Sequence, residues 1–255
     1  IFVRIQALNN MQSSVVTAWI GAILYTLQIY YDFSGYSDMA IGLGRMFGFH
    51  FPQNFNYPYI AASITDFWRR WHMTLGTWFR EYVYIPLGGN RVTTAKHIRN
   101  LLIVWGLTGV WHGAGINFLL WGLYYGVLLI IEKYLIGGFL NKHKVIGHAF
   151  TLIAVVIGWM LFANTSFASL GQYFGMMFGI GGVSFFNATA GYFLRTSIVL
   201  LVLGVLFSTP IIHQLGEQIF VRYPKVSVAV RVFLFFLCIA ALVYQTYNPF
   251  LYFRF

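Results

Sequence analysis

Long apolar runs, separated by short polar or glycine-rich stretches, dominate the pattern of this 255-residue chain. A helix that crosses a bilayer needs about 20 mostly apolar residues, because the hydrocarbon core is about 30 Å thick and a helix rises about 1.5 Å per residue. Six segments meet or approach this length: Val15 to Tyr31, Leu101 to Trp111, Phe118 to Ile131, Ile146 to Phe162, Thr196 to Ile212 and Val228 to Tyr244. The pattern therefore predicts an all-α membrane protein, a bundle of several spans.

Basic residues are concentrated in alternate connections between these predicted spans. The basic connections hold Arg69, Arg70, Arg80, Arg91, Lys96 and Arg99, then Lys133, Lys142 and Lys144, and then Arg222, Lys225 and Arg231. The intervening connections, at residues 113–117 and 164–193, contain no charged residue. Because basic loops stay on the cytoplasmic side of a membrane, this alternation indicates a chain that weaves through a bilayer with its basic loops in the cytoplasm.

The segment between the first two spans, residues 32–99, is too polar for a lipid-facing helix and too apolar for a soluble domain. Within residues 66–84, apolar side chains recur at positions 67, 71, 75, 78 and 82, with arginines between them. This spacing predicts one helix, starting near Asp66, with an aromatic stripe and a basic face. We expect it to lie in the interface or to re-enter the membrane against other helices.

The domain organisation is simple, because no internal repeat and no low-complexity linker interrupts the chain. We expect a single membrane domain over residues 1–255. The first residues, Ile1-Phe2-Val3-Arg4, include no initiator Met and do not match a signal peptide. We therefore expect further spans to precede this segment.

Composition agrees with the pattern, since 59% of residues are hydrophobic, 20% aromatic and only 9% charged. Soluble domains carry about 25% charged residues, so lipid must contact most of this surface. The net charge of +10 is spread between apolar segments, which is typical of contact with anionic lipids; we expect membrane lipids as partners and no nucleic acid. The single cysteine, Cys238, excludes a disulfide within the chain.

His112 is the first candidate for chemistry, because it ends an apolar run and is followed by small residues in Gly113-Ala114-Gly115. An ionisable group at membrane depth is costly and indicates a functional role. A neutral imidazole accepts a proton from a hydroxyl group and later returns it, which is general-base chemistry. The alternative is a structural histidine that holds two helices together, and its position alone does not separate the two.

The second candidate is His72, which lies on the aromatic helix after two arginines. It is either a residue that binds or polarises an acyl donor, or an interface histidine beside a basic face. Around it, Arg69, Arg70, Trp71 and Arg80 are candidate donor-binding residues, since guanidinium groups match phosphate oxygens. The alternative is that these arginines contact anionic lipid headgroups.

Three acidic residues are assigned structural roles: Asp32, Asp38 and Asp66. Carboxylates at membrane depth are costly unless paired, so we expect Asp32 or Asp38 to meet an arginine of the following segment. We predict no metal site, because the histidines are dispersed and neither HExxH nor CxxC occurs. Nucleophile-elbow and phosphate-loop patterns are also missing from the sequence.

Four motifs in order resemble the membrane-bound O-acyltransferase (MBOAT) family, in the branch of the membrane subunit of bacterial alginate O-acetyltransferase. They are Tyr31-Asp32-Phe33-Ser34-Gly35-Tyr36-Ser37-Asp38, Asp66-Phe67-Trp68-Arg69-Arg70-Trp71-His72, Tyr84-Ile85-Pro86-Leu87-Gly88-Gly89-Asn90-Arg91 and Trp111-His112-Gly113. The ending Asn248-Pro249-Phe250-Leu251-Tyr252-Phe253 is also similar to that branch. The present sequence resembles the C-terminal portion of such a protein.

The resemblance implies a ring of tilted and re-entrant helices around a funnel. His112 matches the signature histidine of the family, which is taken as catalytic, and His72 matches a second histidine of its prokaryotic members. It further implies a cytoplasmic acyl donor such as acetyl-CoA, used as a substrate, with no bound cofactor. An extracytoplasmic SGNH-type esterase or transferase would be the partner, and the bacterial inner membrane the location.

These inferences give a hypothesis of acyl transfer, most simply of acetyl, from a thioester to a hydroxyl group of a cell-surface polysaccharide such as alginate or another exopolysaccharide. His112 acts as general base, while His72 orients the donor or stabilises the oxyanion. One rival is a glycan or lipid transporter with the histidines in a proton path, although no inverted repeat is visible. A second rival is a scaffold that only docks an esterase.

Overall fold

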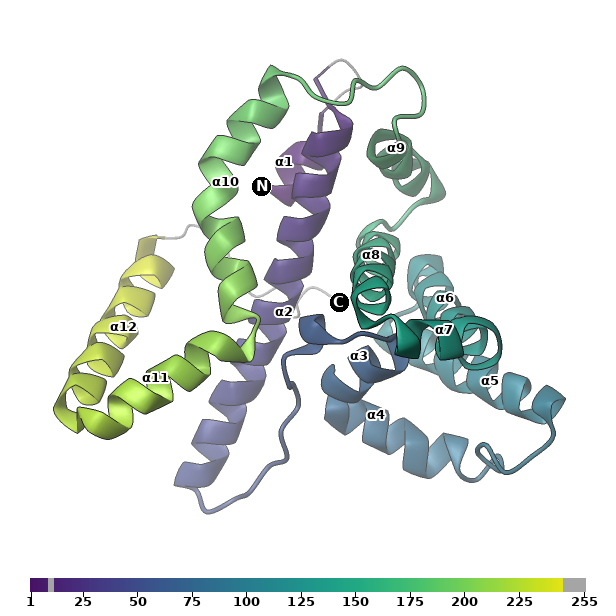
Figure 1. Cartoon of the computed structure of the whole chain (residues 1–255), viewed down its shortest axis with the longest axis horizontal. Coiled ribbons are helices and arrows are strands. Elements are labelled where there is room, and N and C mark those ends of the chain that lie inside the picture. Colours follow the sequence, from purple (N-terminus) through teal and green to yellow (C-terminus); the bar gives the residue numbers. More distant parts are fainter. Residues whose placement is uncertain (9–11, 245–255) are drawn as a thin grey trace.

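The computed structural model describes residues 1–8 and 12–244, so the motif at residues 248–253 lies outside the described residues. Helices account for nearly all of its regular structure (Figure 1). The α-helices are α1 (Phe2–Gln6), α2 (Val15–Met46), α3 (Ile64–Arg70), α4 (Met73–Phe79), α5 (Thr94–His112), α6 (Ile116–Ile131), α7 (Gly137–Lys142), α8 (Lys144–Ala163), α9 (Phe167–Phe178), α10 (Ala188–Phe207), α11 (Pro210–Arg222) and α12 (Pro224–Tyr244). The shorter turns are the 3-10 turn η1 (Pro58–Ile60) and the π-helical turns η2 (Arg80–Tyr84) and η3 (Glu132–Ile136).

Four helical segments of the described chain are long and apolar enough to cross a membrane: Ile116–Lys142, Lys144–Ala163, Ala188–Phe207 and Pro224–Val243. They contain or overlap the last four predicted spans, so the prediction of a multi-span all-α membrane protein is confirmed. The first two predicted spans lie in α2 and α5, which are helical but include more polar residues. In Figure 1, α2 stands at the centre, with α10 and α12 on one side and α5 to α8 on the other.

The predicted end of the first span at Tyr31 is wrong. Helix α2 continues to Met46 and is 32 residues long, about 48 Å at the usual rise per residue. Asp32 and Asp38 therefore lie within this helix. The prediction ended the span where the apolar run ends, at the first Asp and Ser residues. These residues lower helix propensity only modestly, so the helix itself continues through them.

The prediction of one continuous aromatic helix from Asp66 to Tyr84 is also wrong. The helix begins earlier, where the Ser63 side chain accepts a hydrogen bond from Asp66 N, and it breaks at Trp71 and His72. His72 has a left-handed backbone (φ 46°), an uncommon conformation for a residue with a side chain. The break gives two short helices, α3 and α4, in place of one.

The boundaries of the fifth span were misplaced. Helix α10 begins after Asn187, whose side chain caps it, and ends at Phe207, while Pro210 starts the separate helix α11. Proline lacks an N–H and clashes with the preceding turn, so it favours the first turn of a helix over its interior. The charge-free connection at residues 164–193 contains helix α9, which the apolar pattern did not separate.

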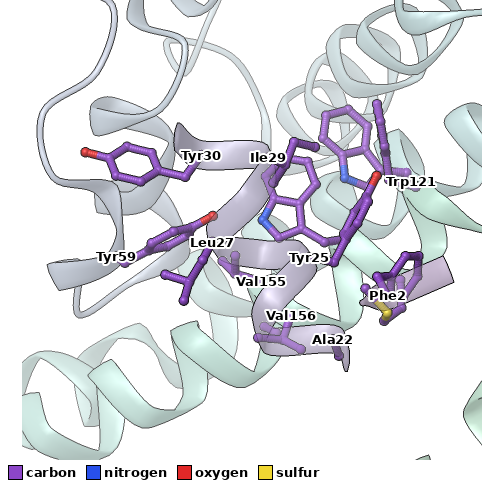
Figure 2. Close-up of a cluster of buried hydrophobic side chains, with 14 of the residues drawn as sticks. Phe2, Ala22, Tyr25, Leu27, Ile29, Tyr30, Tyr59, Trp121, Val155 and Val156 are labelled. Atoms are coloured by element: carbon purple, nitrogen blue, oxygen red, sulfur yellow. The ribbon is translucent and has the colours of Figure 1, made fainter. Parts of the chain in front are cut away.

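Aromatic and aliphatic side chains from α2, η1, α6 and α8 form one buried core. Figure 2 shows Tyr25 and Ile29 of α2 gathered with Tyr59, Trp121 and Val155. The hydroxyl group of Tyr59 donates to the carbonyl oxygen of Thr26 at 2.6 Å, which fixes the loop before α3 against α2. This core also packs Trp71, the neighbour of the candidate His72, against Tyr30 and Phe33 of the central helix.

Helices α5 and α6 form a hairpin that is packed through glycine. A methyl group at Gly109 would lie 2.5 Å from the carbonyl oxygen of Phe118, and one at Gly122 would collide with the carbonyl oxygen of Trp105. Small residues of this kind let two helices approach at backbone distance inside a membrane. The close approach determines where His112, the last residue of α5, meets α6.

Candidate functional site

His112 lies in an aromatic pocket between α5, α6 and α8. Its ring is 4.7 Å from the Trp121 ring and 5.7 Å from the Phe162 ring, between centroids, and both contacts are edge-on. Its Nδ1 is 2.7 Å from the backbone oxygen of Thr108, one turn earlier in α5. The side chain is partly buried.

The Thr108 contact determines which nitrogen of His112 carries the proton. A backbone carbonyl can only accept, so Nδ1 of the neutral ring must be the N–H donor and Nε2 must hold the lone pair. Nothing in the described part of the chain hydrogen-bonds to this Nε2. The ring therefore presents an unprotonated nitrogen that is available to accept a proton.

His72 lies at the break between α3 and α4 and is held by Asn54, from the loop after α2. The Nδ1 of His72 is 3.0 Å from Oδ1 of Asn54. The ring meets Phe33 of α2 edge-on at 4.7 Å between centroids. Burial, together with the nearby His112, lowers the pKa of His72 to about 3, so the imidazole is neutral at pH 7.

The structure brings the two candidate histidines together, although they are 40 positions apart in the sequence. Trp111 contacts both rings: its centroid is 6.0 Å from that of His72 and 4.9 Å from that of His112. Their proximity allows two imidazoles to act on one substrate.

A cavity of about 660 Å³ opens beside His72, between the α3–α4–η2 segment and α5. Its lining includes His72 and Thr108, and the carbonyl oxygen of Thr108 is the group that His112 contacts, so the cavity reaches His72 and lies next to the residue that holds His112. Its walls also hold aromatic side chains and the basic side chains of Arg69, Arg80 and Lys133. A chamber with an apolar interior and cationic groups on its wall suits a long, partly anionic ligand.

The predicted donor-binding residues divide into two groups. Arg69, Trp71 and Arg80 line the cavity. Arg70 does not line it: its Nε forms an ion pair with Asp66 at 3.0 Å and its Nη1 reaches the carbonyl oxygen of Asn56 at 3.3 Å. The structure thus gives Arg70 contacts that stabilise α3.

Among the acidic residues, Asp66 forms this ion pair within α3. Asp38 is exposed on α2. That Asp32 or Asp38 meets an arginine stays a prediction. Over residues 1–8 and 12–244, no cluster of three or more His, Cys, Asp or Glu side chains is placed to hold a metal ion.

Three polar residues near the cavity were missed by sequence reasoning. Buried Glu132 accepts hydrogen bonds from the first turn of α3, at 2.6 Å from Ile64 N and 3.1 Å from Thr65 N. Buried His97 lies between the hydroxyl groups of Tyr84 and Tyr134, each at 2.8 Å. Asn54 holds His72.

For one of these three residues, Glu132, the local sequence indicates a buried polar contact. Glu132 is a lone carboxylate directly after an apolar run, and such a group indicates a buried partner. Neither His97 nor Asn54 has a comparable signal, because their partners come from segments that are distant in sequence.

Comparison with known proteins gives the family. The family model of MBOAT, the membrane-bound O-acyltransferase family, matches residues 2–171. The chain is 39% identical over 259 residues to a probable alginate O-acetylase, AlgI, of Pseudomonas putida, which covers 93% of this chain and 53% of that protein. It is 42% identical over 175 residues to the peptidoglycan O-acetyltransferase of Helicobacter pylori, covering 67% of this chain and 33% of that protein.

A more distant relative is the teichoic acid D-alanyltransferase of Bacillus subtilis, 39% identical over 113 residues, or 41% of this chain and 28% of that protein. The chain spans about half, or less, of the length of these curated relatives. The family match covers both candidate histidines and every wall of the cavity beside them. This chain belongs to the membrane-bound O-acyltransferase family.

Proposed function

We propose that this chain supplies the catalytic centre of a membrane-bound O-acyltransferase. The enzyme moves an acyl group, most simply acetyl, from a cytoplasmic thioester donor to a hydroxyl group of a cell-surface polysaccharide or of a partner transferase. One observation carries the proposal: two neighbouring histidines each have an unprotonated Nε2, and one of them, His72, lines a cavity with arginines on its wall. The family assignment supports the same chemistry.

In this mechanism, His112 is the general base. Its Nε2 takes the proton of the acceptor hydroxyl group while that oxygen attacks the thioester carbonyl carbon. The C–S bond then breaks, and His112 returns the proton to the leaving thiolate. The Thr108 carbonyl oxygen, 2.7 Å from Nδ1, keeps the ring oriented and stabilises the imidazolium as it forms.

His72 has the role of orienting the donor. Its Nδ1 donates a hydrogen bond to Asn54, so the neutral ring has a lone pair at Nε2. This nitrogen can accept a hydrogen bond from an N–H or O–H group of the acyl donor. Stabilising an oxyanion would require a proton on Nε2, and burial opposes that protonation by lowering the pKa of His72. Of the two roles considered, orientation of the donor fits better.

The cavity is the proposed donor site. Its apolar and aromatic lining, with Trp68 and Trp105, suits the extended arm of a thioester donor such as acetyl-CoA. Arg69, Arg80 and Lys133 would bind its phosphate groups, because guanidinium and ammonium groups pair with phosphate oxygens. These residues belong to the basic connections, which agrees with a donor arriving from the cytoplasm.

The acceptor is proposed to be a polymer at the bacterial surface, because the names of the relatives refer to alginate, peptidoglycan and teichoic acid. Residues 113–117 and 164–193, the charge-free connections, would then face the extracytoplasmic side. We propose the inner membrane as the location and an SGNH-type transferase or esterase as the partner on that side.

Deletion of the gene tests this proposal against the transporter alternative. We expect the surface polymer to be exported in normal amount but to lack its O-acyl groups, as measured by mass spectrometry of purified polymer, with acylation restored by complementation. If the deletion strain instead failed to export the polymer, and the polymer retained in the cells still carried its acyl groups, the result would contradict the proposal and favour a transporter.

A further inference from the structure

The loop that precedes α3 lies directly against the break that carries His72. Two backbone hydrogen bonds join them: Met73 N donates to the Asn54 oxygen at 2.9 Å, and Asn56 N donates to the Arg70 oxygen at 2.9 Å. The bonds lie on either side of His72. They hold its left-handed backbone in place and put the Asn54 side chain beside the imidazole ring.

Asn54 is 9% exposed, and only one orientation of its side-chain amide forms hydrogen bonds with all of the neighbouring groups. Its Oδ1 accepts from the Thr74 hydroxyl group at 2.9 Å and from Thr74 N at 3.3 Å, while its Nδ2 donates to the Ser37 hydroxyl group at 3.0 Å. Flipping the amide would point an NH₂ group at the backbone N–H of Thr74, and two donors cannot bond.

This orientation determines the tautomer of His72. Because Oδ1 faces the ring at 3.0 Å and can only accept, Nδ1 carries the hydrogen and Nε2 is unprotonated. Phe33 from α2 and Trp111 from α5 contact the faces and edges of the ring and contribute no titratable group. Among the described residues, His112 is the titratable group that acts on it from a neighbouring helix.

We propose that Asn54 is a positioning residue for acyl transfer: it fixes His72 as the Nδ1–H tautomer, so that Nε2 works as a hydrogen-bond acceptor in the donor cavity. This inference rests on the proposed function and adds a residue that no motif indicates. Asn54 acts through His72 and does not contact the cavity itself. Ser37 and Thr74 hold the amide in turn.

Asn54→Asp is the most informative variant, because a carboxylate accepts from His72, from both Thr74 groups and from the Ser37 hydroxyl group. The geometry is kept, but the negative charge favours protonated His72 and raises its pKa by about one to three units. We expect the ratio of kcat at pH 8 to kcat at pH 5 to be larger than in the wild type, by up to about tenfold, with activity near the wild-type value at pH 8. Asn54→Ala should lower kcat by about 10²-fold at all pH values, with little change in KM for the acceptor.

Gln53→Ala is the control, because the Gln53 side chain donates to the Phe55 oxygen of the same loop, at 2.6 Å, and has no hydrogen bond to His72 among the described residues. Its pH profile and kcat should equal those of the wild type. All variants are assayed in membranes after the amount of protein is measured. If Asn54→Ala does not accumulate, Asn54→Asp and Asn54→Ser carry the test.

Three results would overturn the inference. A wild-type pH profile in an active Asn54→Asp enzyme would mean that Asn54 does not act through His72. Higher kcat of Asn54→Asp at pH 5 would mean that His72 works as the imidazolium. Failure of all three variants to accumulate would give Asn54 a purely structural role. An inactive wild-type protein would instead contradict the proposed acyl transfer itself, so the two failures are distinct.

Discussion

At the scale of single residues, the hydrogen bond at Nδ1 decides what each histidine can do. Thr108 and Asn54 supply acceptors from different elements, yet both leave Nε2 unprotonated. A histidine whose Nδ1 donates to a fixed acceptor has its tautomer and its ring orientation set together. The site thus contains two acceptor nitrogens, which suits proton removal from a hydroxyl group.

Neighbouring arginines provide a matched test of the donor site. Arg69→Gln removes a cationic side chain from the cavity wall, so we expect KM for the thioester donor to rise about five- to tenfold, a loss of about 1 kcal/mol or slightly more. Arg70→Gln is the control, since Arg70 pairs with Asp66 away from the cavity. Initial rates at varied donor concentration give both values. Equal increases in KM for the two variants would contradict the assignment of the cavity as the donor site.

Residue type and motif were sufficient to find His72 and His112 from the sequence, but not their surroundings. Asn54 reaches His72 across 18 positions, and only the folded loop shows the contact. The same holds for His97 and its two tyrosine partners. Local patterns do not encode contacts between distant segments, so these roles could not be predicted.

At the scale of elements, continuous apolar runs made some helices easy to predict and polar interruptions made others difficult. Helix α8 begins and ends within two residues of its predicted span, because nothing breaks its apolar run. The α3–α4 break was missed because the spacing of aromatic residues is the same on both sides of His72. What breaks the helix is the loop around Asn54, through hydrogen bonds that the helical pattern does not contain.

The α5–α6 hairpin is the element whose packing most directly positions His112. Gly109→Ala would bring a methyl group against the backbone of Phe118, where no side chain can move aside. We expect a loss of about 1–3 kcal/mol in stability, seen as a lower unfolding temperature in detergent, together with reduced kcat. The helices must separate to accommodate the methyl group, and His112 moves with them.

Gly106→Ala is the matched control on the same helix. Its added methyl group would lie 3.9 Å from a Leu123 side-chain carbon, an ordinary contact, and alanine favours the helix by up to about 1 kcal/mol over glycine. Its unfolding temperature should be equal to or above that of the wild type. Equal stability of the Gly109 and Gly106 variants would contradict the close backbone approach.

At the scale of the whole molecule, the order of basic and charge-free connections agrees with the positions of the site residues. His112 ends α5 beside the charge-free turn, whereas Arg80 and Lys133 belong to basic connections. The cavity is lined by both of these basic residues and by Thr108, whose carbonyl oxygen contacts His112. We therefore expect the donor and the acceptor to reach the histidines from opposite sides of the membrane.

The most direct test of this account is the rate of acyl transfer by His112→Ala. Membranes that contain the protein are supplied with radiolabelled acetyl thioester, and label in the acceptor is measured, with His213→Ala, an exposed histidine in α11, as the control. A general base contributes about 10²–10⁴-fold, so kcat should fall by at least about 10²-fold while the amount of protein in the membrane is unchanged. Wild-type acyl transfer by His112→Ala would contradict the central claim.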